Sequence, residues 1–528
     1  PEGGPLVWGQ AESPDERAVV VGVGLERRAQ VGGACTLERP FADPGYLVSP
    51  CAYLVGLLHP VVIEELALAR RGFEVFVVDP HLWCPFEDGT SLTLWGDDQR
   101  TVAAISQLAP DQVAGYLGYQ RLFGRIRDAL RPLGDGDTWL GPAPSREEIE
   151  ERLGHDDEAI ACLFEDSIVD VLDRYVSDDR LRTALHGQGI IGTFAGPRDK
   201  GTACVHWMHT SGHLQGQGGA WGYVRGGMGV VSRAIAGAAL DNGAVLACGV
   251  TAASVEDNGG PGGGGMVVVT DAGDRIPARV VVSNADPLTT AAMFEGELPE
   301  ATRARLRTWS STSPVVKVNC GLGRLPHFSA GGGAGAGAPM APHRAMVTIS
   351  TGIDATQSAC AAARRGEVDP AWCELYFHTA YDPSVAPEGR HVMSVFAQYA
   401  PYRLARGTWD ERREEIGDAV VSAVARFAPD VAEVIEHREV LGPPDVEAKV
   451  GLAGGHIFQG ECLPDQMWQG RFAPRFGAHG LYLCGASTHP GGSVIGVNGR
   501  NAAMAVLGNL GVAVTGRPAP FLDGTLDR

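Results

Sequence analysis

The chain lacks three features that would each point to a class of protein. No apolar run among its 528 residues is long enough to cross a membrane, so no transmembrane segment is expected. Its eleven cysteines are odd in number and include no CxxC pair, which fits buried thiols in a reducing compartment better than a disulfide framework. Basic residues are outnumbered, 43 against 63 acidic ones, giving a formal charge of -20. Such a surface repels phosphate backbones, so no nucleic-acid partner is expected.

What is present is the composition of a globular protein, 44% hydrophobic and 20% charged, with length for roughly three or four domain-sized units. The first 17 residues carry more acid than base, unlike a targeting peptide. We expect residues 1–17 and 516–528 to be flexible. Gly-rich runs at 259–265 and 329–342 predict a hairpin loop and a flexible surface segment.

Strand and helix patterns alternate along the chain. Residues 278–287 (ARVVVSNADP) and 479–485 (HGLYLCG) are typical of buried strands, and 226–250 predicts a Gly-led helix followed by a strand. Residues 145–176 predict a helix, with Ser145 and Glu148 spaced as a capping box. This alternation indicates an α/β fold rather than a bundle or a sandwich.

The strongest local pattern is HGLYLCGASTHPGGSVIGVNGRNAAMAVL, a buried strand, a Gly-rich turn and a helix rich in alanine. Gly491 and Gly492 allow a ligand to approach the backbone closely. The first N–H groups of the helix have no partner within it and carry partial positive charge, so they favour an anion or an electron-rich ring oxygen. A plain strand–turn–helix connection is the alternative.

These residues resemble the C-terminal flavin signature of the phytoene desaturase-like FAD oxidoreductases, and most closely the subgroup of pyridine nucleotide-disulfide oxidoreductase domain-containing proteins. The resemblance runs from about residue 18 to 510. The C-terminal and GGAWGYVRGGMG blocks are quite specific. Other blocks agree in order with that family: ERRAQVGGA, VVSNADP, TSPVVKVN and FAQYAPY.

The resemblance implies a discontinuous FAD/NAD(P)-binding Rossmann-like domain, with an amine oxidase-like fold, interleaved with an α+β substrate domain. Residues 18–80, 216–300 and 476–512 would form the first domain, on one parallel sheet, and residues 81–215 and 301–475 the second. The cofactor implied is FAD. Carried over residue by residue, the cofactor-binding positions are Gly22, Gly24, Glu26, Arg27, Arg28, Gly32, Gly33, Val250, Gly485, Ala486, Gly492, Ser493, Val494 and Ile495.

The opening stretch VVVGVGLERRAQVGG departs from the family. About twenty residues should separate the Gly-rich turn from the acid that binds the ribose, but here only Leu25 lies between Gly24 and Glu26. A parallel crossover takes a dozen or more residues, so two parallel strands cannot form. We therefore expect AVVVGVGLE to be one strand ending at Glu26, with the first β–α unit truncated and FAD weakly bound.

Three histidines have a spacing that occurs in metal sites. His206, His209 and His213 are spaced as HxxHxxxH, which can place zinc ligands on one helical face. No acidic base accompanies them as in HExxH, and the neighbouring Gly, Thr and Ser weaken a helix. We expect no metal here and interpret the three as polar residues near a substrate cavity.

The resemblance implies an FAD-dependent oxidoreductase of the dehydrogenase or desaturase type, acting on a mainly apolar small molecule such as a polyene. No catalytic side chain is identified from the sequence. The subgroup is associated with the mitochondrial matrix, which implies a link to mitochondrial function and a protein partner there; a bacterial source would make the chain cytoplasmic. The alternative is a flavin-poor regulatory or interaction protein that keeps the fold without catalysis.

Overall fold

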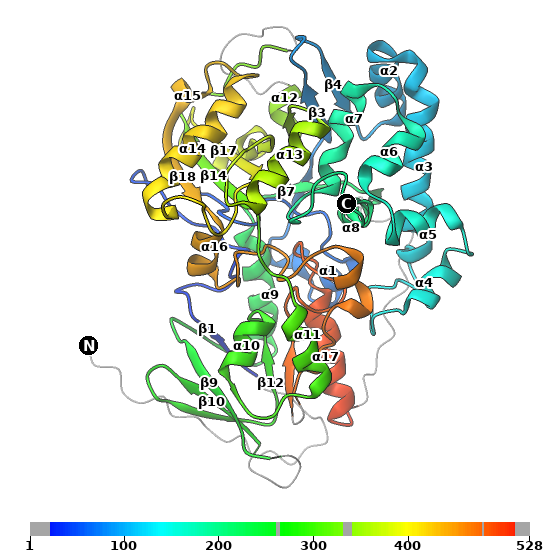
Figure 1. The fold of residues 1–528 in the computed structure, drawn as a ribbon. Helices are drawn as coiled ribbons and strands as arrows, with labels where there is room; N and C mark the ends of the chain where they lie inside the picture. Colours follow the sequence, from blue (N-terminus) through cyan, green and yellow to red (C-terminus); the bar gives the residue numbers. More distant parts are fainter. Residues whose placement is uncertain (1–21, 260–264, 331–340, 478–479, 513–528) are drawn as a thin grey trace.

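The structure is a computed structural model that describes residues 22–259, 265–330, 341–477 and 480–512. The α/β class is confirmed, because helices and several sheets alternate along the chain. Two lobes are visible (Figure 1). The upper lobe is built around a large sheet, and the lower lobe contains the strands and helices that the sequence assigns to the cofactor domain. The predicted flexible tails and most of both Gly-rich runs lie outside the described residues.

The upper lobe is organised by a mixed seven-stranded sheet. Its strands, in spatial order, are β18 (Ile435–Leu441), β14 (Val315–Leu322), β17 (His391–Gln398), β16 (Trp372–Tyr376), β15 (Val347–Ser350), β3 (Leu82–Pro85) and β4 (Ser91–Leu94). Along β14 the side chains alternate between faces. Val316 and Val318 join the core formed with α14 (Trp409–Ala425), whereas Lys317 and Asn319 lie on the opposite face.

A layer of helices packs beside this sheet, around one large apolar core. It includes α3 (Val113–Leu130), α5 (Asp157–Phe164), α6 (Ile168–Tyr175) and α8 (Thr202–Thr210). The predicted capping box is confirmed at α4 (Arg146–Arg152), where Ser145 Oγ accepts from Glu148 N at 3.2 Å. The single helix predicted over 145–176 is wrong. Asp156 and Ser167 accept hydrogen bonds from following N–H groups and so begin α5 and α6 as new helices.

In the lower lobe, the four strands that lie in the predicted cofactor-domain segments form two separate parallel pairs. β1 (Val23–Glu26) pairs with β8 (Val245–Cys248), and β12 (Val281–Ser283) pairs with β19 (Leu481–Leu483). Among the described strands nothing joins one pair to the other, so the one continuous sheet that we expected is not formed. The chain is too short here, because only Leu25 separates Gly24 from Glu26 and a crossover to another parallel strand needs a dozen or more residues.

The two parallel strand pairs differ in how their outer edges are covered. On β19, Leu481 O accepts from Phe476 N and Leu483 N donates to Pro474 O, so residues 474–476 cover the edge away from β12. β1 has β8 as its strand partner within the described part of the chain. The end of β1 at Glu26 confirms the predicted strand end, and residues 18–21 lie outside the description. The domain boundaries stay a prediction.

The remaining elements close the lower lobe (Figure 1). α9 (Gly229–Asp241) packs against β8, and α17 (Val497–Asn509) packs against β19. β9 (Ala252–Asp257) and β10 (Met266–Thr270) form an antiparallel pair on either side of the 259–265 run, as expected for a hairpin. They belong to a four-stranded sheet with β11 (Arg275–Ala278) and β13 (Phe294–Glu295). None of the described helices is long and apolar enough to span a bilayer.

Candidate functional site

The first part of the candidate site lies where β1 ends. Glu26 is half-buried, and its Oε1 accepts from Arg28 N at 3.0 Å. Val250 N donates to Glu26 O at 3.1 Å, which places the predicted adenine-side strand end beside the predicted ribose acid. Gly22 directly precedes β1 and its carbonyl accepts from Val245 N, whereas Gly24 lies within β1 and pairs with Leu246 of β8. The structure therefore brings these four predicted residues together.

The loop after β1 is held by its own arginine. Arg28 Nη1 donates to Gly33 O at 2.6 Å, and Arg28 forms an ion pair with Glu38. Gly32 has a φ of +123°, and a Cβ there would lie 2.6 Å from Cys35 O and 2.8 Å from Ser232 Oγ, so only glycine fits. Gly33, at φ +52°, has open space around it. Arg27 is exposed and donates to Ala448 O at 3.2 Å.

The second part is the turn between β19 and α17. A Cβ on Gly485 would lie 2.4 Å from Gln459 Oε1, and Ala486 O accepts from the buried Arg471 Nη1 at 2.7 Å. A Cβ on Gly492 would lie 2.6 Å from Phe458 Cδ1 and 2.9 Å from its Cα. In this structure both glycines thus make room for the segment 456–461 rather than for an open groove.

The turn is strained at two residues that are not glycine. Ser493 has a φ of +78° and Val494 a φ of +56°, a region that a β-branched residue rarely adopts. Ile495 is buried, and its carbonyl accepts from His59 N at 3.0 Å. α17 begins at Val497, two residues later than the last predicted position, with Gly496 as its N-cap.

The two ends of this arrangement offer polar groups that suit an FAD, but its middle does not. At the flavin end, Ser487 Oγ and His489 Nδ1 are buried without a hydrogen-bond partner among the described residues, as expected where a ligand or water belongs. At the nucleotide end stands the half-buried Glu26. For the pyrophosphate, residues 27–59, all of which are described, contain no helix that could direct N–H groups at it.

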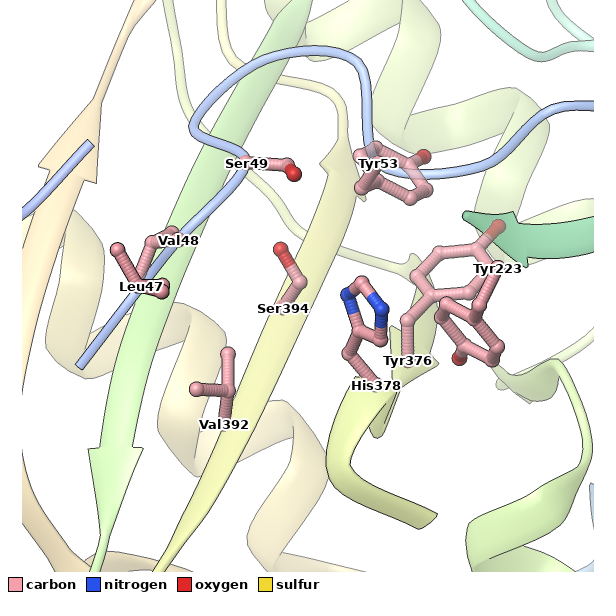
Figure 2. A pocket seen from close by; sticks show the side chains of 9 residues that line it. All are labelled: Leu47, Val48, Ser49, Tyr53, Tyr223, Tyr376, His378, Val392 and Ser394. Carbon is pink, nitrogen blue, oxygen red and sulfur yellow. The ribbon is translucent and has the colours of Figure 1, made fainter. Parts of the chain in front are cut away.

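Sequence reasoning missed a buried lysine on the other side of the site. Lys317 is 4% exposed, contacts Ser394 Oγ, and lies 3.7 Å from the centre of the Tyr53 ring. Tyr53 and Ser394, which it contacts, line a small hollow that Figure 2 shows between residues 47–53 and the sheet. Four ring side chains line it: Tyr53, Tyr223, Tyr376 and His378. In the sequence, TSPVVKVN resembles a family block, and no local signal there marks its lysine as functional.

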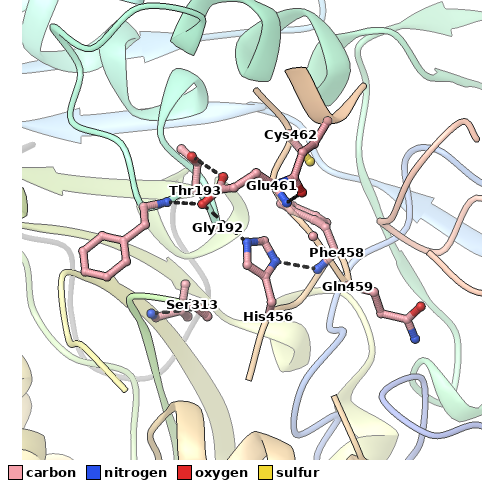
Figure 3. A network of polar contacts seen from close by, with 12 residues as sticks. Gly192, Thr193, Ser313, His456, Phe458, Gln459, Glu461 and Cys462 are labelled. Carbon is pink, nitrogen blue, oxygen red and sulfur yellow. Dashed lines mark hydrogen bonds and ion pairs between the residues drawn. The ribbon is translucent and has the colours of Figure 1, made fainter. Parts of the chain in front are cut away.

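A second missed cluster surrounds Glu461 (Figure 3). Its carboxylate accepts from Thr193 Oγ1 at 2.6 Å and from Phe194 N at 2.9 Å, and lies 3.7 Å from His456 Nε2. Burial alone would raise the pKa of Glu461, but the nearby His456 and the hydrogen bonds from Thr193 and Phe194 outweigh burial and lower that pKa. His456 Nδ1 accepts from Phe458 N, so the ring proton of the neutral form lies on Nε2, toward Glu461.

The three predicted polar histidines do not share one face. His206 and His209 are buried on α8, whereas His213 lies on β5 (His213–Leu214). Burial lowers the pKa of His206 to about 3 and that of His209 to about 4, so both rings are neutral at pH 7. Within the described ranges, no group of three His, Cys, Asp or Glu side chains is arranged to hold a metal ion.

Comparison with known proteins settles the family. The chain is 32% identical over 524 residues to pyridine nucleotide-disulfide oxidoreductase domain-containing protein 2 of Rattus norvegicus, covering 92% of this chain and 89% of the relative. The chain belongs to that family. The predicted resemblance is thereby confirmed. No protein-family profile matches the chain.

The chain is also similar to more distant proteins, one by sequence and one by structure. The phytoene dehydrogenase of Streptomyces griseus is 27% identical over 86% of this chain and 84% of its own length. A solved putrescine oxidase, in a variant with redesigned cofactor binding, superposes with a TM-score of 0.54 at 15% identity over 91% of this chain and 92% of the oxidase. The likeness to the oxidase shows the fold alone, and that fold is of the amine oxidase type.

Proposed function

We propose that this chain is an FAD-dependent oxidoreductase of the dehydrogenase or desaturase type, acting on a mainly apolar small molecule such as a polyene. The observation that carries the proposal is the turn from β19 to α17. This turn combines three features: a strand end, buried polar atoms without hydrogen-bond partners at Ser487 and His489, and strained φ angles at Ser493 and Val494. Backbone strain is retained where function requires it. Relatives named as oxidoreductases, phytoene dehydrogenase among them, support the reaction class.

Each part of the site would have a distinct role. FAD, when bound, supplies a ring that takes up hydride from a C–H bond. Glu26 would accept hydrogen bonds from a ribose, and the first N–H groups of α17 would face the electron-rich edge of the ring. The tyrosines of the hollow would orient an apolar substrate and exclude water. His456 and Glu461, fixed by their mutual contact, would hold a proton near the turn.

The experiment is a flavin assay followed by a substrate assay. Purified protein is saturated with FAD, desalted, and scanned for the visible flavin band. It is then incubated without oxygen with carotenoids, unsaturated terpenoids and amines, and bleaching of the band reports reduction. We expect bleaching with an apolar polyene and none with amines. Bleaching by amines alone would overturn the substrate class, and a flavin band that no compound in the panel bleaches would overturn the enzymatic proposal.

A second candidate function is a flavin-poor regulatory or interaction protein. The absence of a helix from residues 27–59 favours it, because the pyrophosphate then lacks its usual donors. Its partner would be another protein, in the mitochondrial matrix if the source is eukaryotic. A protein that stays colourless at high FAD, yet retains one protein partner through purification from its own cells, would support this candidate over the enzyme.

A further inference from the structure

A short loop connects the helical layer to the turn between β19 and α17. It comprises residues 137–141 and lies between α3 and α4. Thr138 attaches this loop to the end of α3, because its backbone N–H and its Oγ1 both donate to Leu130 O, at 3.0 and 2.8 Å. The loop is therefore fixed to a helix that the sequence assigns to the substrate domain.

The loop contacts the turn on both sides of its glycines. Before them, His489 Nε2 donates to Thr138 O at 2.7 Å. After them, on α17, Asn501 Nδ2 donates to Trp139 O at 2.9 Å, and Asn501 Oδ1 accepts from Gly141 N at 2.9 Å. The position of the turn thus depends on the shape of the loop.

One buried carboxylate sets that shape. Asp137 Oδ1 accepts from Trp139 N at 2.9 Å, which closes the backbone around Thr138. Asp137 Oδ2 accepts from Arg131 Nε at 2.9 Å and lies 3.1 Å from His59 Nε2. The side chains of Asp137, Arg131 and His59 are 5%, 3% and 1% exposed. Removing one partner of a buried ion pair leaves the other charge uncompensated, so the contact is costly to lose.

His59 links the same carboxylate to the far end of the turn. Its Nδ1 accepts from Val61 N at 3.1 Å, at the start of α1 (Pro60–Glu65), so the ring proton lies on Nε2 and is donated to Asp137. The backbone N–H of His59 donates to Ile495 O at 3.0 Å. Asp137 is therefore connected to the turn twice, at His489 through the loop and at Ile495 through His59.

The charges of this cluster are defined at neutral pH. Burial alone would raise the pKa of Asp137, but His59 and Arg131 outweigh burial and lower that pKa. Burial lowers the pKa of His59, and it lowers the pKa of His489 to about 4. At pH 7 the cluster therefore contains one ion pair, between Asp137 and Arg131, and two neutral imidazole rings.

The two ring nitrogens of His489 have different roles. Since Nε2 carries the proton that Thr138 O accepts, Nδ1 keeps a lone pair. This Nδ1 is buried and has no hydrogen-bond partner among the described residues. The bond to the loop thus makes the free nitrogen of the turn an acceptor, which suits an N–H or O–H group of a bound cofactor.

The residues between the two points of attachment are strained. Ser493 and Val494, with φ angles of +78° and +56°, lie between His489 and Ile495. Such conformations persist only where the surrounding structure over-determines them. Attachment on both sides supplies that constraint, and Asp137 takes part in both.

We propose that Asp137 is a positioning residue for the cofactor turn. Through the loop and His59 it keeps residues 489–495 in their strained form, and it keeps His489 in the tautomer that leaves Nδ1 as an acceptor. Helices of the predicted substrate domain thereby shape the cofactor site. The identity of the cofactor rests on the proposed function, whereas the attachment of the turn does not.

The test is amide hydrogen exchange in the full chain without added cofactor. Deuterium uptake of peptides from the turn, residues 485–496, is divided by that of peptides from β17, which reports opening of the whole fold. Asp137→Ala leaves the N–H groups of Trp139, Arg131 and His59 without their acceptor. Unpaired buried groups cost enough to change local opening about tenfold or more, so we expect the exchange ratio to rise at least about tenfold.

Three further variants complete the experiment. Asp430→Ala is the matched control, because Asp430 also pairs with an arginine, Arg324, and accepts from a backbone N–H, that of His327 at 2.8 Å, but lies in the lobe of the large sheet. It should leave the exchange ratio unchanged. Asp137→Asn keeps an oxygen for Trp139 N and should restore part of the protection. Asn501→Ala removes two bonds of the loop without leaving a buried charge unpaired, and should raise the ratio.

Exchange of the turn that rises only in step with β17 in Asp137→Ala, or that rises equally in Asp430→Ala, would overturn the proposal. If Asp137→Ala does not fold, an unchanged ratio in Asn501→Ala would show that the loop does not hold the turn and would overturn it as well. FAD titration of the parent chain is read separately. A parent that binds no FAD would refute the proposed function, and the exchange ratios would still decide the role of Asp137.

Discussion

The missing unit between Gly24 and Leu25 gives the sharpest prediction. Insertion there of a GxGxxG turn, a helix and the start of a second strand should make AVVVGVG a strand of its own. That strand should lie between the strand ending at Glu26 and β19, where no described strand now joins the two parallel pairs. The helix N-terminus would then face the FAD pyrophosphate. We expect the parent chain to purify largely colourless and the insertion variant to purify yellow.

The magnitude follows from what the helix adds. Two hydrogen bonds from backbone N–H groups to a charged pyrophosphate contribute about 1.5–3 kcal/mol each, and the helix end about 0.3–1 kcal/mol. The sum, about 3–7 kcal/mol, corresponds to roughly two to five decades in the dissociation constant of FAD. The helix should also cover Val23 and Val245, paired neighbours that are 38% and 49% exposed. Burying what remains of both would stabilise the fold by about 1–3 kcal/mol.

The assay is titration with FAD by quenching of flavin fluorescence, together with urea unfolding of the apoproteins. The matched control carries the same insertion with valine in place of its three motif glycines, which keeps length and helix but blocks close approach of the phosphates. The control should gain stability without gaining affinity. Near-stoichiometric FAD in the parent chain, or equal affinity in all three proteins, would refute this account of the pyrophosphate site.

Three further predictions use residues of the described site. Gly492→Val should lower flavin content, as the sequence predicts, and should lower the free energy of unfolding by about 1–3 kcal/mol, because the new side chain would meet Phe458. Adding Phe458→Ala should reverse part of this loss, and urea melts that show no such coupling would contradict the packing argument. Glu461→Gln should lower the free energy of unfolding at pH 7 and make it depend less on pH in acid. A carboxyl whose pKa is lowered by folding stabilises the fold above its ordinary pKa of 4.5, and this contribution is lost as the pH falls through the folded pKa. Equal dependence on pH in parent and variant from pH 7 to 3 would argue against this role of Glu461. Lys317→Met should stabilise the fold relative to the parent most near pH 7, and this gain in free energy of unfolding should shrink by up to about 1.4 kcal/mol per pH unit toward pH 10. The reason is that the amine has a pKa of 10.5 when unfolded and about 7 when folded, so between these values only the unfolded chain binds the proton. A gain that does not change with pH would show that the amine is charged in the folded chain.

The parts that sequence predicted are those whose signals are local. The strand end at Glu26, the capping box at Ser145 and the strand before Gly485 each depend on a few consecutive residues and their backbone preferences. The family, too, was carried by short blocks. The predicted single helix over 145–176 is wrong because two internal N-caps, Asp156 and Ser167, compete with helical continuation.

Spacing along the chain was enough to exclude two parallel strands around Gly24 and Glu26, since a crossover needs a minimum length of chain whatever the tertiary fold. Which strands then pair was decided only in three dimensions. β12 lies beside β19 although about 200 residues separate them in sequence, and residues 474–476 cover the other edge of β19. Such contacts depend on apolar faces that many strands share, so no short motif specifies them.

The chemistry of Lys317 and Glu461 was likewise decided by tertiary structure. A pKa depends on burial and on the groups within a few ångströms, and these come from segments distant in sequence: Ser394 and Tyr53 for the lysine, Thr193 and His456 for the glutamate. Sequence alone determined the class of fold, the family and the truncated first unit, because each is written in local order or in chain length. The buried amine and the buried carboxylate exist as functional groups only once the fold removes water from them.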